Sequence, residues 1–137
     1  MEFSRWINPS LPQTLLYATY LLYFHAVMAV LFGSIGFFAT FDLAPPIGLF
    51  LMLGSIAAAL GIANDYKWGW ILGLVVSAVP MLAVLSAILS SLGVVSFDFG
   101  RTPRFGLSLI LNAMFPAAQL ALVAHPMSRD HQKIWFR

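Results

Sequence analysis

Four long apolar stretches, separated by short polar segments, run along the chain. Each is close to the length of a helix that crosses a ~30 Å hydrocarbon layer, roughly 20 residues. The pattern predicts helices over residues 14–38, 47–63, 68–94 and 105–124, followed by a short tail, 125–137. No segment shows the apolar–polar alternation of a membrane β-barrel. We therefore predict a single all-α domain, a polytopic membrane protein with four transmembrane helices.

The composition agrees with this class of protein. The chain is 61% hydrophobic and 9% charged, with a mean hydropathy of +0.89, whereas a soluble domain is about half apolar and a quarter charged. So few charges could not cover a surface that faces water, and four spans leave no room for a soluble domain. The apolar stretch from Leu15 to Phe38 is too long for a signal peptide, so we expect it to remain as the first span of a multi-pass plasma-membrane protein.

The basic residues predict the orientation. An even number of spans puts both termini and the 64–67 connection on one side of the membrane. Five basic residues belong to that side: Arg5, Lys67, Arg129, Lys133 and Arg137. Two, Arg101 and Arg104, belong to the other side. All four Trp residues also fall on the first side. Because cytoplasmic segments carry the excess of Lys and Arg, we predict that both termini are cytoplasmic.

Small residues recur four positions apart in the predicted helices. The second helix contains Ala57-xxx-Gly61, and the third contains Gly69-xxx-Gly73-xxx-Ser77. Small side chains let helix backbones approach closely inside a bilayer. The series indicate either packing within the bundle or a docking surface for another subunit. The second and third predicted helices each carry more small faces than packing against one neighbouring helix requires. This favours external partners.

His25 is the ionisable residue that lies well inside a predicted span. It follows Thr14 by 11 residues, or ~16 Å along a helix. The last helix carries a polar stripe, Ser108, Asn112 and Gln119, at a matching depth. A hydrogen bond between the first and last helices is therefore expected. Such a histidine is either a structural contact within the bundle or a functional site.

The sequence carries no recognisable catalytic or metal-binding motif. It has no cysteine, which excludes disulfides, thiolate metal sites and iron–sulfur clusters. His125 and His131 lie at depths that do not match His25, so a pair of axial haem ligands is not expected. We predict a protein that is not an enzyme and has no catalytic, cofactor or metal site. The net charge of +2 reflects topology rather than a nucleic-acid partner.

The predicted tail, which ends in the sequence MSRDHQKIWFR, is a candidate docking element. Arg129, Lys133, Trp135 and Arg137 could contact another subunit or anionic lipid headgroups. A small bundle of this kind usually acts through partners. The expected function is that of a non-catalytic accessory or stabilising subunit, whose partners are other integral membrane subunits and lipids rather than a soluble small molecule. The alternative is a small homo-oligomeric transporter or channel that uses His25.

Four spans with short loops and the ending HPMSRDHQKIWFR resemble small actinobacterial membrane proteins. Some members of that group are accessory subunits of the cytochrome bc–cytochrome oxidase supercomplex of the respiratory chain. The resemblance covers the layout and the tail. It implies a subunit that packs beside redox subunits of an electron-transport complex and binds no cofactor itself.

Overall fold

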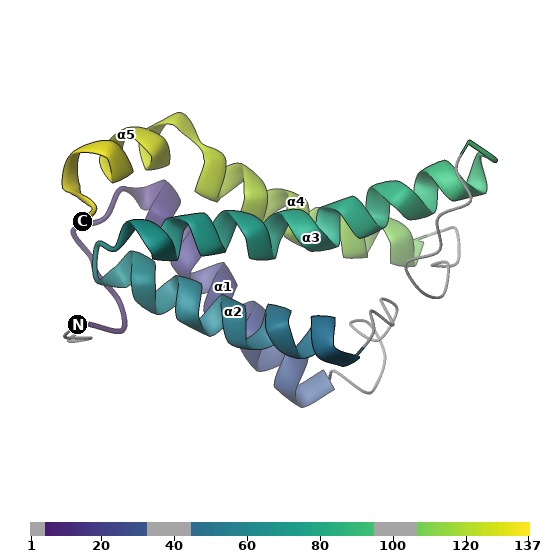
Figure 1. Cartoon of the computed structure of the whole chain (residues 1–137), viewed down its shortest axis with the longest axis horizontal. Helices are drawn as coiled ribbons and strands as arrows, with labels where there is room; N and C mark the ends of the chain where they lie inside the picture. The colour runs from purple at the N-terminus through teal and green to yellow at the C-terminus, as the bar shows by residue number, and fades with distance from the viewer. Residues whose placement is uncertain (1–4, 33–44, 95–106) are drawn as a thin grey trace.

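The computed structural model describes residues 5–32, 45–94 and 107–137 (Figure 1). Within these ranges the regular structure is entirely helical, which confirms the predicted all-α class for this part of the chain. The helices are α1 (Gln13–Phe32), α2 (Pro45–Ala63), α3 (Lys67–Ser91), α4 (Leu107–Ala124) and α5 (Pro126–Trp135). Helix α5 lies within residues 125–137, the segment predicted to be a short tail.

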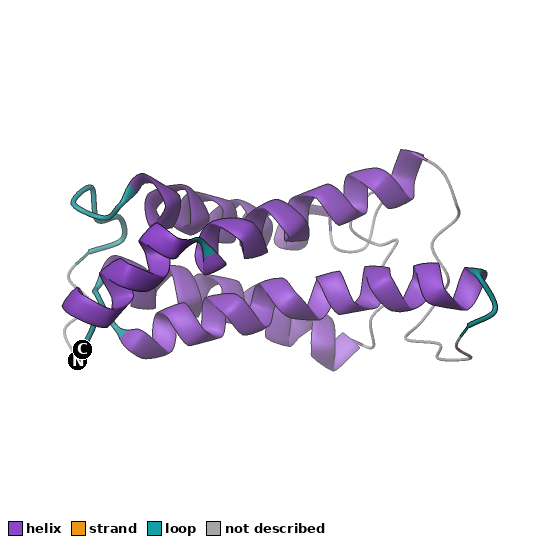
Figure 2. Ribbon diagram, turned by 90° about the horizontal axis from the view of Figure 1, so that it is seen from above, coloured by secondary structure: helices purple, strands orange, loops and turns teal. Residues whose placement is uncertain are grey.

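Helices α1 to α4 form an up-and-down bundle. α1 packs on α2 and, less extensively, on α4, while α3 packs on α2 and α4. α5 folds back against the ends of α4 and α1. Both chain ends and the connection between α2 and α3 lie at one end of the bundle, which we call the terminal end (Figures 1 and 2).

Two of the described helices are long and apolar enough to cross a membrane. They are the Gln13–Leu31 part of α1 and the whole of α3, Lys67–Ser91. The apolar helices Ile47–Ala63 and Ala113–Ala124 are shorter.

The α2–α3 connection is a compact helix-ending motif. The N–H of Tyr66 donates to the carbonyl of Gly61 at 2.9 Å, and the N–H of Asp65 donates to that of Ile62 at 3.1 Å. These two bonds define a Schellman motif, in which the residue just after the helix cap adopts the left-handed conformation. Asp65 takes that conformation with φ 59°, which Asp tolerates better than most side chains. α3 begins directly afterwards at Lys67.

Two glycines bring the backbones of α2 and α3 into contact beside this connection. A Cβ atom on Gly61 would lie 2.5 Å from Cα of Gly69, and one on Gly69 would lie 2.6 Å from N of Ile62. Real side-chain carbons do not occur that close to backbone atoms. Only hydrogen fits at both positions, so this crossing requires glycine in both helices.

The small residues of α2 and α3 are used inside the bundle. Gly54 faces Val76, whose Cγ2 would lie 2.9 Å from an added Cβ, and Gly73 faces Ile62 at 3.4 Å. Ala58 and Ser77 are also buried. At these positions the small faces therefore pack within the bundle, which is the first of the two interpretations, because α2 and α3 each bury the small face of the other. External partners at other small faces stay a prediction.

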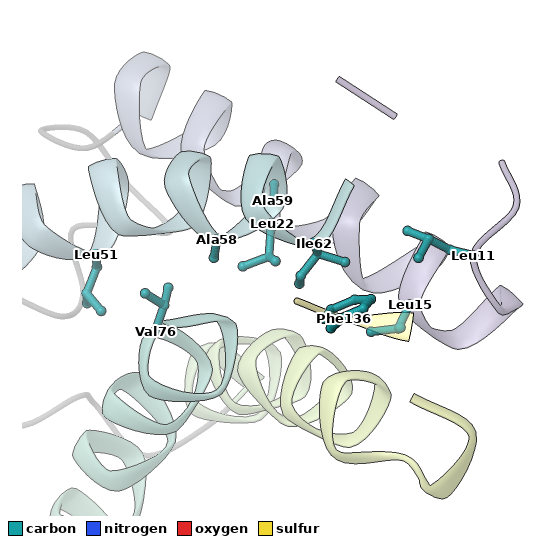
Figure 3. Close-up of a cluster of buried hydrophobic side chains, with 9 residues drawn as sticks. All are labelled: Leu11, Leu15, Leu22, Leu51, Ala58, Ala59, Ile62, Val76 and Phe136. Carbon is teal, nitrogen blue, oxygen red and sulfur yellow. The ribbon is translucent and has the colours of Figure 1, made fainter. Parts of the chain in front are cut away.

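A continuous apolar core runs through the bundle to its terminal end. The buried side chains shown in Figure 3 are Leu11, Leu15, Leu22, Leu51, Ala58, Ala59, Ile62, Val76 and Phe136. Leu51 and Val76 meet across α2 and α3, while Phe136 reaches in from the C-terminal end of the chain beside Leu15 and Ile62 (Figure 3). The segment after α4 thus completes the core.

Replacing Gly69 by Ala should destabilise the bundle, because the added methyl group must push α3 away from α2. We expect a loss of about 2 kcal/mol in the free energy of unfolding, measured in detergent micelles or bicelles. Gly48→Ala is the matched control, since no described residue lies within 4 Å of the added Cβ there. It should be neutral or stabilise by about 0.5 kcal/mol. Equal effects of the two substitutions would contradict the close crossing.

Candidate functional site

His25 contacts α2 and α4 from its place on α1. Its Nδ1 lies 3.0 Å from Oγ of Ser55, a fully buried residue of α2. Its ring lies against Phe115 of α4, with centroids 5.9 Å apart and planes tilted by 53°. Phe115 also packs on Phe24, at 5.6 Å. The histidine is therefore held between three helices.

A second hydrogen bond of Ser55 shows whether His25 Nδ1 or Ser55 Oγ is the donor in this contact. Ser55 Oγ lies 2.7 Å from the carbonyl of Leu51, one turn earlier in α2. A serine hydroxyl has one hydrogen, and this carbonyl takes it. Ser55 must then accept a hydrogen from His25, so Nδ1 of His25 carries the proton and donates. In a neutral imidazole, this places the lone pair on Nε2.

Other buried polar side chains lie near the middle of the bundle. Thr19 donates to the carbonyl of Leu15 at 2.8 Å, and Ser77 donates to that of Gly73 at 2.7 Å. Both are essentially inaccessible, as is Gln119 of α4. Hydroxyls that donate to the preceding turn satisfy themselves without a partner helix. They are thus compatible with an apolar surrounding and are not arranged as nucleophiles.

The predicted polar stripe of the last helix is described in part. Gln119 is 2% exposed, and its Nε2 has no hydrogen-bond partner among the described residues. The side chains of Ser108 and Asn112 lie outside the described residues. The partner of His25 that the structure does describe, Ser55, was not singled out by the sequence, where one serine in a Gly- and Ala-rich helix gives no signal of its neighbour.

The described residues give no sign of a metal centre. Across residues 5–32, 45–94 and 107–137, no group of three or more His, Asp or Glu side chains gathers to hold a metal ion. The His25–Ser55–Phe115 contact joins α1, α2 and α4 through one hydrogen bond and one ring contact.

Helix α5 begins with a clear capping signal. Nδ1 of His125 accepts a hydrogen bond from the backbone N–H of Met127 at 3.2 Å, and Pro126 occupies the first helical position. Proline is well suited there, because its missing N–H has no partner in a first turn. Ser128 then fixes the helix to the bundle. Its Oγ lies 2.7 Å from the carbonyl of Leu122 and 2.8 Å from Oγ1 of Thr14.

The last residues of the chain are bound to the α2–α3 connection. The N–H of Arg137 donates to the carbonyl of Asp65 at 2.9 Å, and the N–H of Lys67 donates to the carbonyl of Arg137 at 3.0 Å. Phe136, between this pair and α5, is buried. We call the reciprocal pair of bonds the C-terminal clamp. The segment predicted to be a tail is therefore part of the fold.

The N-terminal segment binds the same connection from the other side. Asn64 exchanges two hydrogen bonds with the backbone of Arg5, at 3.2 and 2.8 Å. The amide of Asn8 donates to the Asp65 carboxylate at 3.3 Å. Further along, the phenol of Tyr23 donates to the carbonyl of Trp6 at 2.9 Å. The three polar segments of the terminal end thus form one hydrogen-bonded unit.

The four predicted docking residues lie on or just after α5. Arg129, Lys133, Trp135 and Arg137 are all exposed. Lys133 lies 3.7 Å from Asp130, an exposed pair of little energetic value. Met127, Ile134 and Trp135 expose apolar side chains, and Met127 and Ile134, seven residues apart, share one face of the helix. Ser128 is the buried residue of α5 and faces the bundle. α5 is thus amphipathic with an outward apolar face.

His131 of α5 contacts two aromatic rings. Its ring stacks on Trp135 at 6.3 Å and meets Phe136 edge-on at 5.7 Å. Burial among these rings lowers the pKa of His131, and the nearby Asp65 carboxylate opposes this by raising it.

No protein-family model, curated protein or solved structure matches this chain.

The assigned proton of His25 can be tested by ¹⁵N NMR of histidine-labelled protein in bilayers. We expect a neutral ring that carries its hydrogen on Nδ1, identified by its absence from a His25→Gln variant. Ser55→Ala removes the acceptor and should shift the ring toward the Nε2–H form. Ser77→Ala, which removes a hydroxyl that bonds within α3, should leave the signal unchanged. A dominant Nε2–H form in the unmodified protein would contradict the assignment.

Phe136 and Trp135 form a matched pair for testing the docked C-terminal segment. Phe136→Ala removes a side chain that is 4% exposed and should cost about 3 kcal/mol of unfolding free energy. Trp135→Ala removes one that is 66% exposed and should change it by less than about 0.5 kcal/mol. Thermal unfolding in a mild detergent measures both. A Phe136 variant as stable as the Trp135 variant would show that the segment is not docked.

Proposed function

We propose that this chain is a multi-pass plasma-membrane protein with four spans and cytoplasmic termini. We further propose that it acts as a non-catalytic accessory or stabilising subunit of a larger membrane complex. The resemblance of its layout and tail to small actinobacterial subunits points to a respiratory-chain supercomplex as that assembly.

The exposed apolar surface of the helices is the observation that carries the membrane part of the proposal. Of the span in α1, 28% is buried, and of that in α3, 35%, whereas the core helix of a soluble protein is mostly buried. Side chains such as Val30, Leu53 and Leu82 are more than half exposed. At 1.5 Å per residue, α2 and α4, with 19 and 18 residues, are ~28 and ~27 Å long. Each length approaches a ~30 Å hydrocarbon layer.

The terminal end supports the proposed orientation. The exposed cations Arg5, Lys67, Arg129, Lys133 and Arg137 all belong to this end. They accompany two described acidic residues, Asp65 and Asp130. An excess of Lys and Arg at one end favours the cytoplasmic side for that end.

The use of the polar groups supports a structural role. Thr19, Ser55 and Ser77 donate to backbone carbonyls of their own helices, and His25 joins α1 to α2. The three hydroxyl bonds lie within single helices, and the His25–Ser55 contact holds α1 and α2 together. Apolar side chains on the outward surfaces of the helices, such as Val30, Leu53 and Leu82, are left exposed, and these surfaces are suited to contact lipid and neighbouring subunits.

Helix α5 is the proposed contact with the membrane interface. An amphipathic helix with Lys and Arg beside exposed apolar residues lies in the headgroup region. Met127, Ile134 and Trp135 would enter the acyl boundary, while Arg129 and Lys133 would face headgroups or a neighbouring subunit. The C-terminal clamp would hold the helix at that level.

A homo-oligomeric transporter or channel that uses His25 is the second candidate. The observation in its favour is the position of His25, an ionisable group held among α1, α2 and α4 at the depth of the apolar core. Intramembrane ionisable residues often mark ion pathways. This function would require flux that depends on His25.

Purification in a mild detergent separates the two functions. The accessory role predicts that the tagged chain migrates on native gels with other integral membrane subunits in fixed stoichiometry, and that a tag on such a subunit recovers this chain. His25→Ala should leave that assembly in place. Recovery of the chain only with itself, together with proton or ion flux in liposomes that His25→Ala abolishes, would overturn the accessory role in favour of the transporter.

A further inference from the structure

A groove runs along the outer surface of α1 beside α2. Its volume is about 360 Å³, and its lining is almost wholly apolar. Tyr23, Val27 and Val30 stand on one face of α1, at i, i+4 and i+7. Ala26 lies among them with a short side chain, and Ile56 of α2 closes the other side. From Tyr23 to Leu31 the groove follows α1 for ~12 Å.

The end of the groove at Trp6 has a different character. Trp6 lines the groove and is 69% exposed, and its carbonyl accepts the hydrogen bond from Tyr23. Amphipathic rings of this kind prefer the level of the lipid headgroups. Arg5, the preceding residue, is held by its two hydrogen bonds to Asn64 and exposes its side chain. The groove therefore has an apolar shaft, and the exposed cation Arg5 directly precedes the Trp6 at its mouth.

The charges around this mouth are mainly positive. Lys67 and Arg137, linked by the C-terminal clamp, flank the same α2–α3 connection as Arg5 and are exposed. The nearby Asp65 carboxylate accepts a hydrogen bond from Asn8. A linear apolar molecule with an anionic head matches both parts of this surface.

We propose that the groove binds one acyl chain of an anionic phospholipid and that Arg5 pairs with its phosphate. A transmembrane helix of a partner is a poorer occupant, because close helix docking needs small residues. This face of α1 instead presents Tyr23, Val27, Val30 and Leu31, with Ala26 as the exception. The inference requires α1 and α2 to lie in a bilayer but does not require a partner subunit.

Native mass spectrometry of delipidated protein, titrated with phosphatidylglycerol or phosphatidylcholine of identical chains, tests the proposal. We expect one phosphatidylglycerol to bind more tightly than phosphatidylcholine. Arg5→Gln should weaken phosphatidylglycerol about fivefold and leave phosphatidylcholine unchanged. Val30→Trp, which fills the groove from a position 65% exposed, should weaken both lipids.

Two matched controls keep the charge at position 5 or add the same bulk elsewhere. Arg5→Lys retains the cation that Arg5→Gln removes, and Leu82→Trp enlarges a side chain of α3 that is 61% exposed. Both should bind lipid like the unmodified protein, and all four variants should unfold at its temperature. Equal affinity for the two lipids would overturn the proposal, as would a loss in either control equal to that in its partner variant.

A photo-crosslinking side chain at position 30 examines the occupant in intact membranes. Crosslinks to phospholipid support the acyl-chain site. Crosslinks mainly to another protein would show that a partner helix covers the groove, which would overturn the lipid site while supporting the accessory role. The two proposals can therefore fail separately.

Discussion

The contact between the backbones of Gly61 and Gly69 is the constraint on which the terminal end of the molecule depends. In an apolar environment the hydrophobic effect does little to pair helices, so close packing must do it. Because these two glycines let α2 and α3 touch, the chain can reverse within residues 64–66 and still satisfy the last carbonyls of α2 through the Schellman bonds. The reversal places Asn64 and Asp65 where the ends of the chain can bind them.

This arrangement links segments that are far apart in sequence. Arg5 bonds to Asn64, and Arg137 bonds to Asp65 and Lys67, so both ends of the described chain close on one short connection. Each of these polar backbone groups would be costly to leave unpaired near a bilayer. Apolar side chains link distant segments in the same way, since Phe136 packs beside Leu15 (Figure 3). Among residues 5–32, 45–94 and 107–137, the charged side chains and the hydrogen-bonded connections are therefore concentrated at the terminal end.

The helices were predictable because apolar runs of membrane length leave little choice of structure. The predicted ends at Ala63 and Ala124 coincide with those of α2 and α4, and the predicted start of α3 differs by one residue. Helix α5 was missed because its composition is polar, although His125 followed by Pro126 was available as a signal for the start of a helix. The pairing of His25 with Ser55 could not be derived, because periodicity defines the faces of a helix but not which neighbour each face meets. The same limit applied to the small-residue faces, whose position inside the bundle depends on the α2–α3 hairpin.

The central claim is that the chain spans the membrane four times with the terminal end in the cytoplasm. The absence of native cysteine allows single-cysteine variants to be labelled without background, and Lys67 and Lys133 are exposed at the terminal end. With a membrane-impermeant maleimide on intact cells, we predict that Lys67→Cys and Lys133→Cys remain unlabelled until the membrane is permeabilised, whereas Thr102→Cys is labelled at once. Labelling of Lys67→Cys or Lys133→Cys in intact cells, or protection of all three, would contradict the account.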